Sequence, residues 1–360
     1  MTKLFKPLKL RDLEVRNRIF IAPMCQYSCE NQDGVVNSWH EVHYGSRSVG
    51  GAGMVIVEAT GVSPEGRITP WCAGIWNEEQ VVAWKRVNDI VKKHGARSAI
   101  QLAHAGRKAS TQRGWDGKSG TISVADRGWS TVSATSEPFE GYEPPRELQT
   151  AEVYEIIEEF KSSAERSVRA GFEAIEIHAA HGYLIHQFLS PLTNNRTDEF
   201  GGSLENRARL LLEITKAIRA AIPSGMPLMI RFSATDYRDG GWDLEQTQQV
   251  AKWCAEAGVD LFDISSGGLI TGVKIPTGPG YQVPLAIGVG EVIVQPVAAV
   301  GQITTSAQAE KILQGGGVEV IAIARASLRD PYWPLRAAAE LGVEVDYWPT
   351  QYLRGKWPKD

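Results

Sequence analysis

The sequence has little of three features that would each point to a particular class of protein: cysteine, net charge and long apolar runs. Its four cysteines, Cys25, Cys29, Cys72 and Cys254, are scattered and do not form a disulfide framework. No second Cys or His pair follows Cys25 and Cys29 at zinc-finger spacing, so we expect no metal site. The formal net charge of −4 gives no reason to expect nucleic acid or an anionic membrane as a partner.

No run of residues is apolar and long enough to span a bilayer, and residues 1–7 lack the apolar segment of a signal peptide. We therefore expect no membrane partner and a cytoplasmic location. The chain does contain ample apolar mass, because 43% of its 360 residues are hydrophobic and 22% are charged. That balance is typical of a globular protein with a large core.

Short apolar strands alternate with amphipathic helices along most of the chain. Eight strands are expected at residues 18–22, 53–59, 98–102, 173–177, 228–232, 260–264, 296–300 and 318–323. The clearest helices between them are expected at residues 78–93, 151–170, 205–222, 244–257 and 306–313. Eight strand–helix alternations favour an α/β fold of the (β/α)8 type, the TIM barrel, over an open parallel sheet.

The chain is longer than a bare barrel, which takes about 250 residues. Residues 5–15 read as an N-terminal hairpin that could close the bottom of the barrel. Two inserted loops, at about 106–147 and 184–204, hold most of the remaining length. Both follow a strand, so we expect them on the C-terminal face, and we expect residues 1–360 to form a single domain.

Two histidines and a tyrosine, His178, His181 and Tyr183, follow the fourth expected strand within six residues. An imidazole N–H can hold a developing oxyanion, and a phenol can give up a proton. One such residue alone would more often be an ordinary polar or packing residue. Three together at the mouth of a parallel strand indicate an active site, because sites of α/β proteins lie at strand ends.

Alternation along the same strand places Ala174, Glu176 and His178 on one face. If that face points into the barrel, Glu176 is a buried carboxylate that needs a cation or hydrogen-bond donors. We expect Arg231, on the next strand, to be its partner. The alternative is that Glu176 faces outward toward the helices.

The last two strands end in residues suited to a phosphate group. Gly301 and Gln302 follow the seventh strand, and Ala324 and Arg325 follow the eighth. In barrels of this type, the loops after these two strands are the usual phosphate site. Gly301 would allow a close backbone approach, and Arg325 offers a bidentate donor.

Seven motifs extend this picture over nearly the whole chain, at residues 16–27, 58–60, 101–107, 178–183, 187–191, 195–207 and 325–331. With these motifs the chain resembles the Old Yellow Enzyme family of FMN-dependent ene-reductases. Cys25 after Met24, together with Tyr27 and His181, resembles the branch called thermophilic-like, which includes bacterial xenobiotic reductases and NADPH dehydrogenases.

The resemblance implies FMN bound noncovalently over the barrel mouth. The residues that it places against the flavin ring are Ala22, Pro23, Met24, Cys25, Ala59, Gln101, His178 and Arg231. The residues that it places around the phosphate are Gly301, Gln302, Ala324 and Arg325. Ala324 stands where most relatives have glycine, which adds one methyl group to the phosphate loop. Cys25 could instead be a small buried apolar residue.

The resemblance also implies a reaction. NADPH, with NADH possible, would reduce FMN, and reduced FMN would deliver hydride to the β-carbon of an activated alkene such as an enone, enal, maleimide or nitroalkene. His178 and His181 would hold the substrate oxygen, and Tyr183 would protonate the α-carbon.

Several alternatives to this reaction are open. The main role could be reduction of xenobiotic nitro compounds or quinones, or an activity like that of dienoyl-CoA reductases. Those reductases carry an iron–sulfur cysteine cluster and further dinucleotide domains, which this sequence lacks. A phosphate-binding aldolase or isomerase would need a lysine at a strand end, and none is present. A non-catalytic flavin-binding protein is the remaining option.

The C-terminal tail, residues 346–360, is rich in residue types that bind ligands. In the branch that the chain resembles, such a tail reaches into the site of a neighbouring protomer. The resemblance therefore implies a homodimer or homotetramer in which Tyr352, Arg354 and Trp357 join Tyr27 in binding substrate. A frayed terminus is the other interpretation of the tail.

Overall fold

The computed structural model describes residues 2–357; the last three residues of the expected interface tail, 358–360, lie outside them. Eight parallel strands close into a barrel, in which each strand pairs with the next along the chain and the last pairs with the first. They are β3 (Ile19–Ile21), β4 (Met54–Gly61), β5 (Arg97–Ala103), β8 (Ala174–Ala179), β9 (Leu228–Ser233), β10 (Leu261–Ser265), β11 (Val297–Ala299) and β12 (Val320–Ile323). The predicted (β/α)8 barrel is confirmed.

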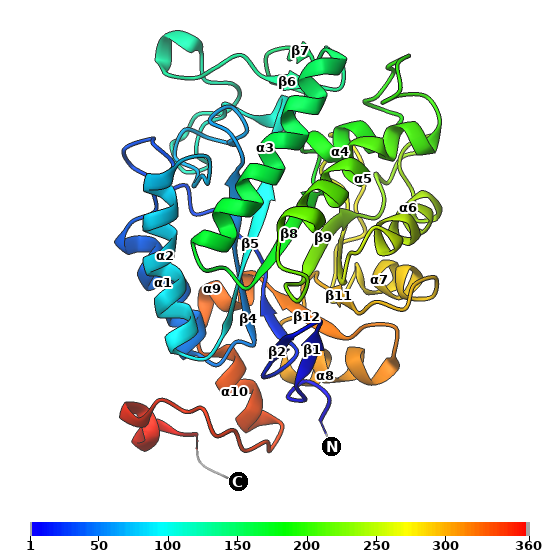
Figure 1. Cartoon of the computed structure of the whole chain (residues 1–360). Helices are drawn as coiled ribbons and strands as arrows, with labels where there is room; N and C mark the ends of the chain where they lie inside the picture. The colour runs from blue at the N-terminus through cyan, green and yellow to red at the C-terminus, as the bar shows by residue number, and fades with distance from the viewer. Residues whose placement is uncertain (1, 358–360) are drawn as a thin grey trace.

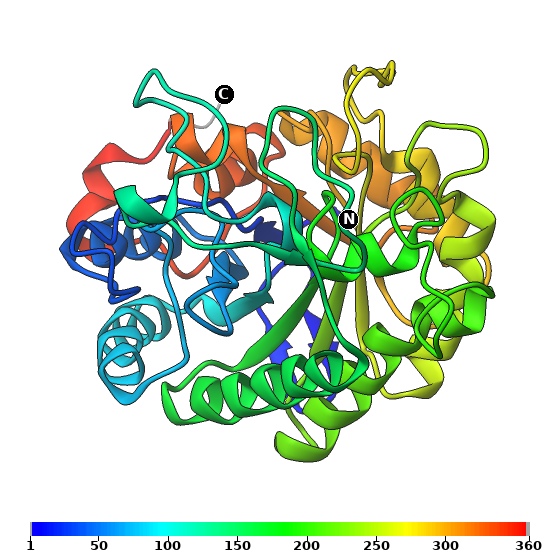
Figure 2. The same ribbon diagram turned by 90° about the horizontal axis from the view of Figure 1, so that it is seen from above.

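Helices surround the barrel on its outside (Figures 1 and 2). They are α1 (Ser38–Val49), α2 (Glu78–Lys93), α3 (Thr150–Arg169), α4 (Leu184–Leu189), α5 (Leu204–Ala221), α6 (Leu244–Glu256), α7 (Val283–Gly290), α8 (Ser306–Gly315), α9 (Arg325–Arg329) and α10 (Trp333–Glu340). Local sequence sets their ends, as α2 shows: Asn77 caps it through the Gln80 amide N–H, and Lys92 and Lys93 stand at its negative end. Among residues 2–357, no helix is long and apolar enough to cross a membrane.

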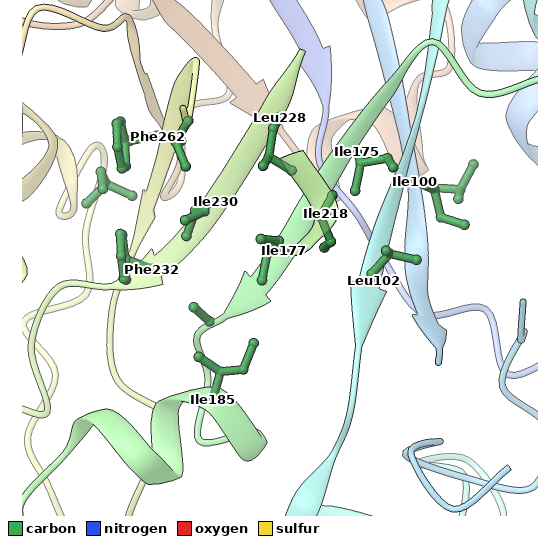
Figure 3. Packing of buried hydrophobic residues seen from close by; sticks show 14 of the residues in the cluster. Ile100, Leu102, Ile175, Ile177, Ile185, Ile218, Leu228, Ile230, Phe232 and Phe262 are labelled. Carbon is green, nitrogen blue, oxygen red and sulfur yellow. The ribbon is translucent and has the colours of Figure 1, made fainter. Parts of the chain in front are cut away.

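Apolar side chains form two separate layers. The outer layer, between strands and helices, includes Ile100, Ile175, Ile177 and Ile230 (Figure 3). The inner layer fills the amino-terminal half of the barrel with side chains from its strands, among them Phe20, Met54, Ala99, Ala174 and Met229.

The N-terminal hairpin, β1 (Leu8–Leu10) paired with β2 (Leu13–Val15), packs Leu10 and Val15 against this inner layer. The predicted hairpin is therefore confirmed as the plug of one barrel end. Since that end is sealed by apolar side chains, polar chemistry is confined to the carboxyl ends of the strands.

The two inserted loops rise from those carboxyl ends (Figure 1). Residues 106–147 carry the short pair β6 (Val132–Ser133) and β7 (Arg146–Glu147), with single turns at Gly106–Lys108 and Val124–Asp126. The second insertion, expected as a loop at residues 184–204, begins instead with the helix α4 (Leu184–Leu189). There, α4 is buried at every residue, because Leu184, Ile185, Phe188 and Leu189 give it an apolar surface.

Candidate active site

Strand β8 directs alternate side chains into and out of the barrel, as its sequence predicts. Ala174 joins the inner apolar layer, whereas Ile175 and Ile177 join the outer one. Glu176 and His178, on the same face as Ala174, therefore point into the barrel above that layer. Because Glu176 shares the face of Ala174 and is fully buried, the alternative of an outward Glu176 is wrong.

The expected ion pair between Glu176 and Arg231 does not form, although the charge of Arg231 still acts on the Glu176 carboxyl group. The Gln101 amide donates to Oε1 of Glu176 at 2.8 Å, while Nε of Arg231 lies 3.2 Å from Oδ2 of Asp263. The expectation compared only the adjacent strands β8 and β9. It failed because the carboxylate that pairs with the guanidinium lies on β10, the other neighbour of β9.

Two buried carboxyl groups thus lie near one guanidinium, and burial raises the pKa of both in spite of its positive charge. Burial and the nearby Asp263 charge raise the pKa of Glu176 to about 8, although Arg231 and Gln101 act in the opposite direction. Burial likewise raises the pKa of Asp263, against the effect of Arg231. At neutral pH Glu176 is mostly protonated, so the layer below the site carries less negative charge than its residues suggest.

A left-handed turn follows β8 and aims the predicted catalytic side chains. His181 has φ of 58° and Gly182 has φ of 73°. A β-carbon on Gly182 would lie 2.3 Å from the carbonyl oxygen of Gly268, so the turn packs directly against the loop after β10. Only glycine fits at this position, because both the backbone angle and the close approach exclude a side chain.

Gly182→Ala should lower the free energy of unfolding by roughly 2–5 kcal/mol, the sum of left-handed strain and overpacking. Chemical denaturation measures this loss. Gly202→Ala is the matched control, because Gly202 has φ of 85° and nothing within 4 Å of the position of an added β-carbon. It carries only the strain, so equal losses in the two variants would contradict the packing described here.

Four side chains hold the backbone of this turn. The ammonium of Lys108 donates to the carbonyl of His181 at 2.9 Å, and the amide of Gln187 donates to that of Gly182 at 2.7 Å. The His181 N–H donates to the hydroxyl of Ser233, and the Gly182 N–H donates to Nδ1 of His186. The turn is therefore fixed from the inserted loop, from α4 and from β9.

Both active-site histidines are neutral at physiological pH. Burial lowers the pKa of His178 and of His181 well below the usual value, and the charge of Arg231 adds to the effect. Nδ1 of His178 accepts the Ala180 N–H at 3.2 Å, which leaves Nε2 as its donor.

His181 has a competing partner. Its Nε2 lies 2.7 Å from the hydroxyl of Ser265, which in turn donates to Gln282. The proton on Nε2 therefore points to Ser265 in this arrangement. A substrate oxygen held by His181 must compete with Ser265 for that proton.

Tyr183 packs among residues that the sequence analysis assigned to the same site. Its ring stands edge-on to His178, with centroids 5.0 Å apart. It joins Cys25, Tyr27 and Ala59 in one apolar cluster. Burial and the nearby Cys25 raise the pKa of the Tyr183 phenol well above its usual value, so the group keeps a proton to give.

Lys108 approaches the same tyrosine from the inserted loop, with Nζ 5.2 Å from the ring centroid. Burial and the neighbouring Arg107 lower the pKa of Lys108 to about 8. Lys108 belongs to the inserted loop and does not end a strand, so it was not among the expected site residues. The structure brings it to the site.

The segment that carries Cys25 is anchored by a buried carboxylate. Oε2 of Glu58 accepts the Gln26 N–H at 2.9 Å, and Oε1 accepts the hydroxyl of Tyr44 at 2.9 Å. Burial and the neighbouring Cys72 raise the pKa of Cys25, so it is a thiol and not a thiolate at neutral pH.

A cavity of about 440 Å³ lies beside the ends of β11 and β12. Its wall includes all four residues predicted to hold a phosphate, Gly301, Gln302, Ala324 and Arg325. Gly301 has φ of 123°, and a β-carbon there would come within 3.0 Å of the Gln282 amide. Ala22 packs with Val300 and Ala322, which line the same cavity.

The cavity also contains groups that the sequence analysis did not name. Arg329 adds a second cation to the wall that contains Arg325, and Tyr281 and Gln282 pack directly against Gly301. Arg231 lines the cavity as well, with its Nε 3.2 Å from Oδ2 of Asp263. A cavity with a polar guanidinium in the barrel and two further arginines at the strand ends fits FMN, whose polar ring and phosphate are at opposite ends.

The tail does not reach the site of its own chain. Residues 350–355 form an exposed turn near α10, at the end of the barrel that holds the N-terminal hairpin (Figure 1). Tyr352 and Trp357 are exposed by 46% and 40%, and the Tyr352 ring lies 5.8 Å from that of Tyr332.

Among residues 2–357, no group of three or more His, Cys, Asp or Glu could hold a metal ion.

Sequence reasoning missed Ser233 and Ser265, which end β9 and β10, and Asp263, which lies in the middle of β10. A signal was present, because Ser233 and Ser265 are polar residues that end apolar strands, as His178 does. It missed His186 and Asp236 for another reason: both are fully buried, and neither ends a strand.

Comparison with known proteins agrees with the geometry. Residues 3–344 match the model of the NADH:flavin oxidoreductase / NADH oxidase family. A Geobacillus thermodenitrificans protein named NADPH dehydrogenase is 43% identical over 355 residues, 98% of either chain. The old yellow enzyme homologue from Zymomonas mobilis has a TM-score of 0.79 and 26% identity, with 99% of each chain covered.

A 2-naphthoyl-CoA reductase has a TM-score of 0.84 and 31% identity, but the match covers 95% of this chain and only 52% of that one. This chain spans about half the length of that reductase. The full-length matches, the barrel and the cavity beside β11 and β12 agree: the chain belongs to the NADH:flavin oxidoreductase / NADH oxidase family and is a flavin oxidoreductase.

Proposed function

We propose that this enzyme reduces activated alkenes, with NADPH as reductant and FMN as the bound flavin. The observation that carries the proposal is the placement of His178, His181 and Tyr183 beside Cys25 on one wall of the barrel mouth. Two neutral imidazoles and one protonated phenol are the groups that reduction of a polarised C=C bond needs. Bound FMN would accept a hydride from NADPH and supply it to the β-carbon of the alkene.

The chain's own residues would do the rest of the chemistry. Nε2 of His178 would donate to the carbonyl or nitro oxygen of the substrate. The Nε2–H of His181 would break its hydrogen bond to the Ser265 hydroxyl and donate to the same substrate oxygen. These donors draw charge from the β-carbon as hydride arrives. Tyr183 would give its proton to the α-carbon and regain one from solvent, which completes the addition of two hydrogens.

Arg231 would lie near the flavin ring, where its charge would stabilise a reduced, anionic flavin. Gln101, Ala59, Pro23 and Met24 would complete the flavin floor, and Gly301, Gln302, Ala324 and Arg325 would hold the phosphate. The methyl group of Ala324 is accommodated, because its side chain packs beside Ala22 and Ala322. We also propose that residues 1–360 act as one FMN-binding domain in the cytoplasm, where the four free cysteines would stay reduced.

Product analysis tests the proposed reaction. Purified holoenzyme, NADPH and 2-cyclohexenone, mixed without oxygen, should yield cyclohexanone in a 1:1 ratio to NADPH consumed. Nitrobenzene and a benzoquinone, assayed in parallel, test the alternative roles. Turnover of those two compounds with no cyclohexanone formed would overturn the ene-reductase proposal.

We further propose that the tail of one protomer completes the site of its partner in a homodimer or homotetramer. Its exposed Tyr352 and Trp357 would leave water only at such an interface, and Arg354 would contact substrate across it. Deletion of residues 352–360 should make the oligomer dissociate into smaller species. It should also raise the Michaelis constant for 2-cyclohexenone about tenfold, which is the effect of one lost hydrogen bond to a charged group.

Sedimentation and steady-state kinetics measure the two effects of the deletion. Arg354→Ala is the control, because it should raise the Michaelis constant and leave the oligomer intact. If the deletion changed neither quantity, the tail would have no role at an interface.

A further inference from the structure

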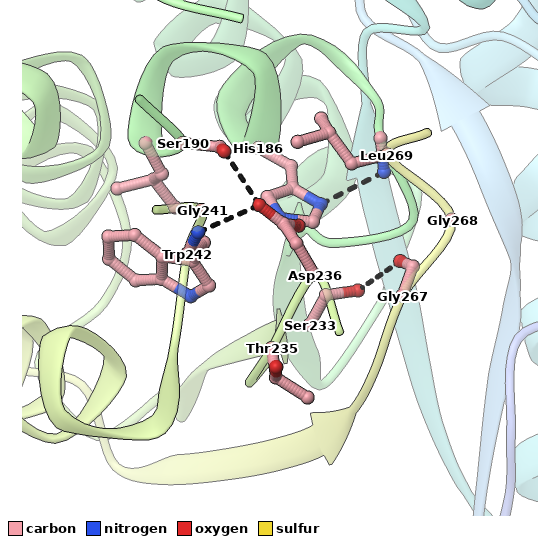
Figure 4. Close-up of polar contacts among 12 residues, drawn as sticks. His186, Ser190, Ser233, Thr235, Asp236, Gly241, Trp242, Gly267, Gly268 and Leu269 are labelled. Atoms are coloured by element: carbon pink, nitrogen blue, oxygen red, sulfur yellow. Dashed lines mark hydrogen bonds and ion pairs between the residues drawn. The ribbon is translucent and has the colours of Figure 1, made fainter. Parts of the chain in front are cut away.

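His186 and Asp236 form a buried pair outside the groups that would touch substrate or flavin. His186 lies on α4 and Asp236 on the loop after β9, and neither side chain is exposed. Nε2 of His186 is 3.0 Å from Oδ1 of Asp236 (Figure 4). A buried charged group needs a specific reason to be present, since replacing such a pair with apolar residues is often neutral or stabilising.

Asp236 is held as a carboxylate. Its Oδ2 accepts the hydroxyl of Ser190 at 2.6 Å and the N–H of Trp242 at 2.8 Å. Burial raises the pKa of Asp236, but the contact with His186 and these two donors outweigh burial and leave the pKa below its usual value. A carboxylate beside Nε2 requires that this nitrogen carry the proton of the imidazole.

That tautomer determines what the other ring nitrogen can do. With the proton on Nε2, Nδ1 of His186 has a free lone pair, and it accepts the Gly182 N–H at 3.0 Å. Gly182 is the second of two consecutive left-handed residues, and His181 before it pays about 1–2 kcal/mol of strain for that conformation. The acceptor therefore acts on the turn that carries His181 and Tyr183.

We propose that His186 and Asp236 are positioning residues for the alkene reduction proposed above, on which this inference rests. The carboxylate of Asp236 selects the tautomer of His186, and Nδ1 of His186 fixes the Gly182 amide. This fixes the turn and so the directions of the His181 imidazole and the Tyr183 phenol. Misplacement of such groups by about 1 Å can cost up to 10²-fold in rate.

Two substitutions of His186 separate its two contacts. In His186→Asn, the amide oxygen replaces Nδ1 and keeps an acceptor for Gly182, but the side chain is too short to reach Asp236. In His186→Gln, the amide nitrogen replaces Nε2 and keeps the donor to Asp236, but no acceptor remains for Gly182. The inference predicts that His186→Gln loses about tenfold or more in the rate at which 2-cyclohexenone reoxidises the reduced enzyme, and His186→Asn loses less than threefold.

A purely structural role predicts the opposite order. His186→Asn leaves Asp236 without its partner and should have the lower melting temperature of the two variants. Hydrogen exchange of the peptide spanning residues 178–188 adds a readout that needs no activity. The Gly182 amide should exchange faster in His186→Gln than in His186→Asn or the unchanged protein.

Asp236→Asn tests the role of the carboxylate. Ser190→Ala is the matched control, because it removes one hydrogen bond to the Asp236 carboxylate and leaves the contact between Asp236 and His186 unchanged. Asp236→Asn should slow reoxidation by 2-cyclohexenone about tenfold, and Ser190→Ala less than twofold. In a Tyr183→Phe background the loss from His186→Gln should shrink, because one of the two groups that the turn aims is absent.

The outcomes are distinguishable from failure of the proposed function. If the unchanged enzyme does not reduce 2-cyclohexenone, the proposed function fails, and hydrogen exchange at Gly182 still tests the positioning of the turn. If it does reduce the enone, equal rates and equal exchange for the two His186 variants would overturn this inference. If Asp236→Asn does not fold, the comparison of His186→Gln with His186→Asn decides the outcome.

Discussion

Replacing Tyr183 with phenylalanine should leave reduction of the bound flavin by NADPH unchanged and slow its reoxidation by 2-cyclohexenone by roughly 10²–10⁴-fold. The phenol is the partly buried proton donor beside His178, and its surroundings raise its pKa and keep it protonated. Phenylalanine keeps the ring packing against Cys25 and Ala59 and removes only the hydroxyl group that carries the proton. Anaerobic rapid mixing with NADPH and then with enone measures the two half-reactions separately.

Tyr154→Phe is the matched control, since Tyr154 is 45% exposed on α3 and donates to Glu199 on the surface. It should change neither rate. An unchanged reoxidation rate in Tyr183→Phe would remove Tyr183 from its proposed role and leave the rest of the site description in place.

Replacing Arg325 with alanine should weaken FMN binding by roughly 10²-fold, about 3 kcal/mol for the lost charge-assisted hydrogen bonds to phosphate. Arg325 stands at the start of α9, on the wall of the cavity that also contains Gly301. Titration of apoprotein with FMN, followed by quenching of flavin fluorescence, measures the dissociation constant.

Arg325→Lys separates charge from geometry. It keeps the positive charge and loses the planar fork, so its affinity should fall between those of the unchanged protein and Arg325→Ala. Arg238→Ala is the remote control, because Arg238 lines a different cavity with Arg107 and Phe139. An affinity unaffected by Arg325→Ala would mean that the phosphate lies elsewhere.

Periodicity along single strands predicted much of the fold and part of the site. Alternation on β8 correctly placed Glu176 and His178 inside the barrel and Ile175 and Ile177 outside it. A side chain's face depends on its own strand, so one sequence segment contains the information.

Partners across strands could not be predicted in the same way. Arg231 can reach carboxylates from either neighbouring strand. Only the packed barrel shows that it forms its ion pair with Asp263, whereas Glu176 accepts a hydrogen bond from Gln101. The pairing of His181 with Ser265 depends equally on the left-handed turn after β8. Nothing in the spacing of the motif indicates that turn.

The burial of His186 and Asp236 shows a further limit. A histidine on a short apolar helix reads as one more packing residue, and an aspartate in a loop reads as solvated. The contacts run from Asp236 to His186, 50 positions earlier in the sequence, and from His186 to the amide of Gly182. Such relays become visible only when the backbone is placed.

The visible absorption spectrum of the purified protein, followed without oxygen, tests the central claim most directly. The account predicts a yellow protein that bleaches when NADPH is added and regains its full colour when 2-cyclohexenone follows. A colourless protein that binds no added FMN would contradict the flavin site, and a bleached protein that 2-cyclohexenone fails to reoxidise would contradict the assignment of His178, His181 and Tyr183.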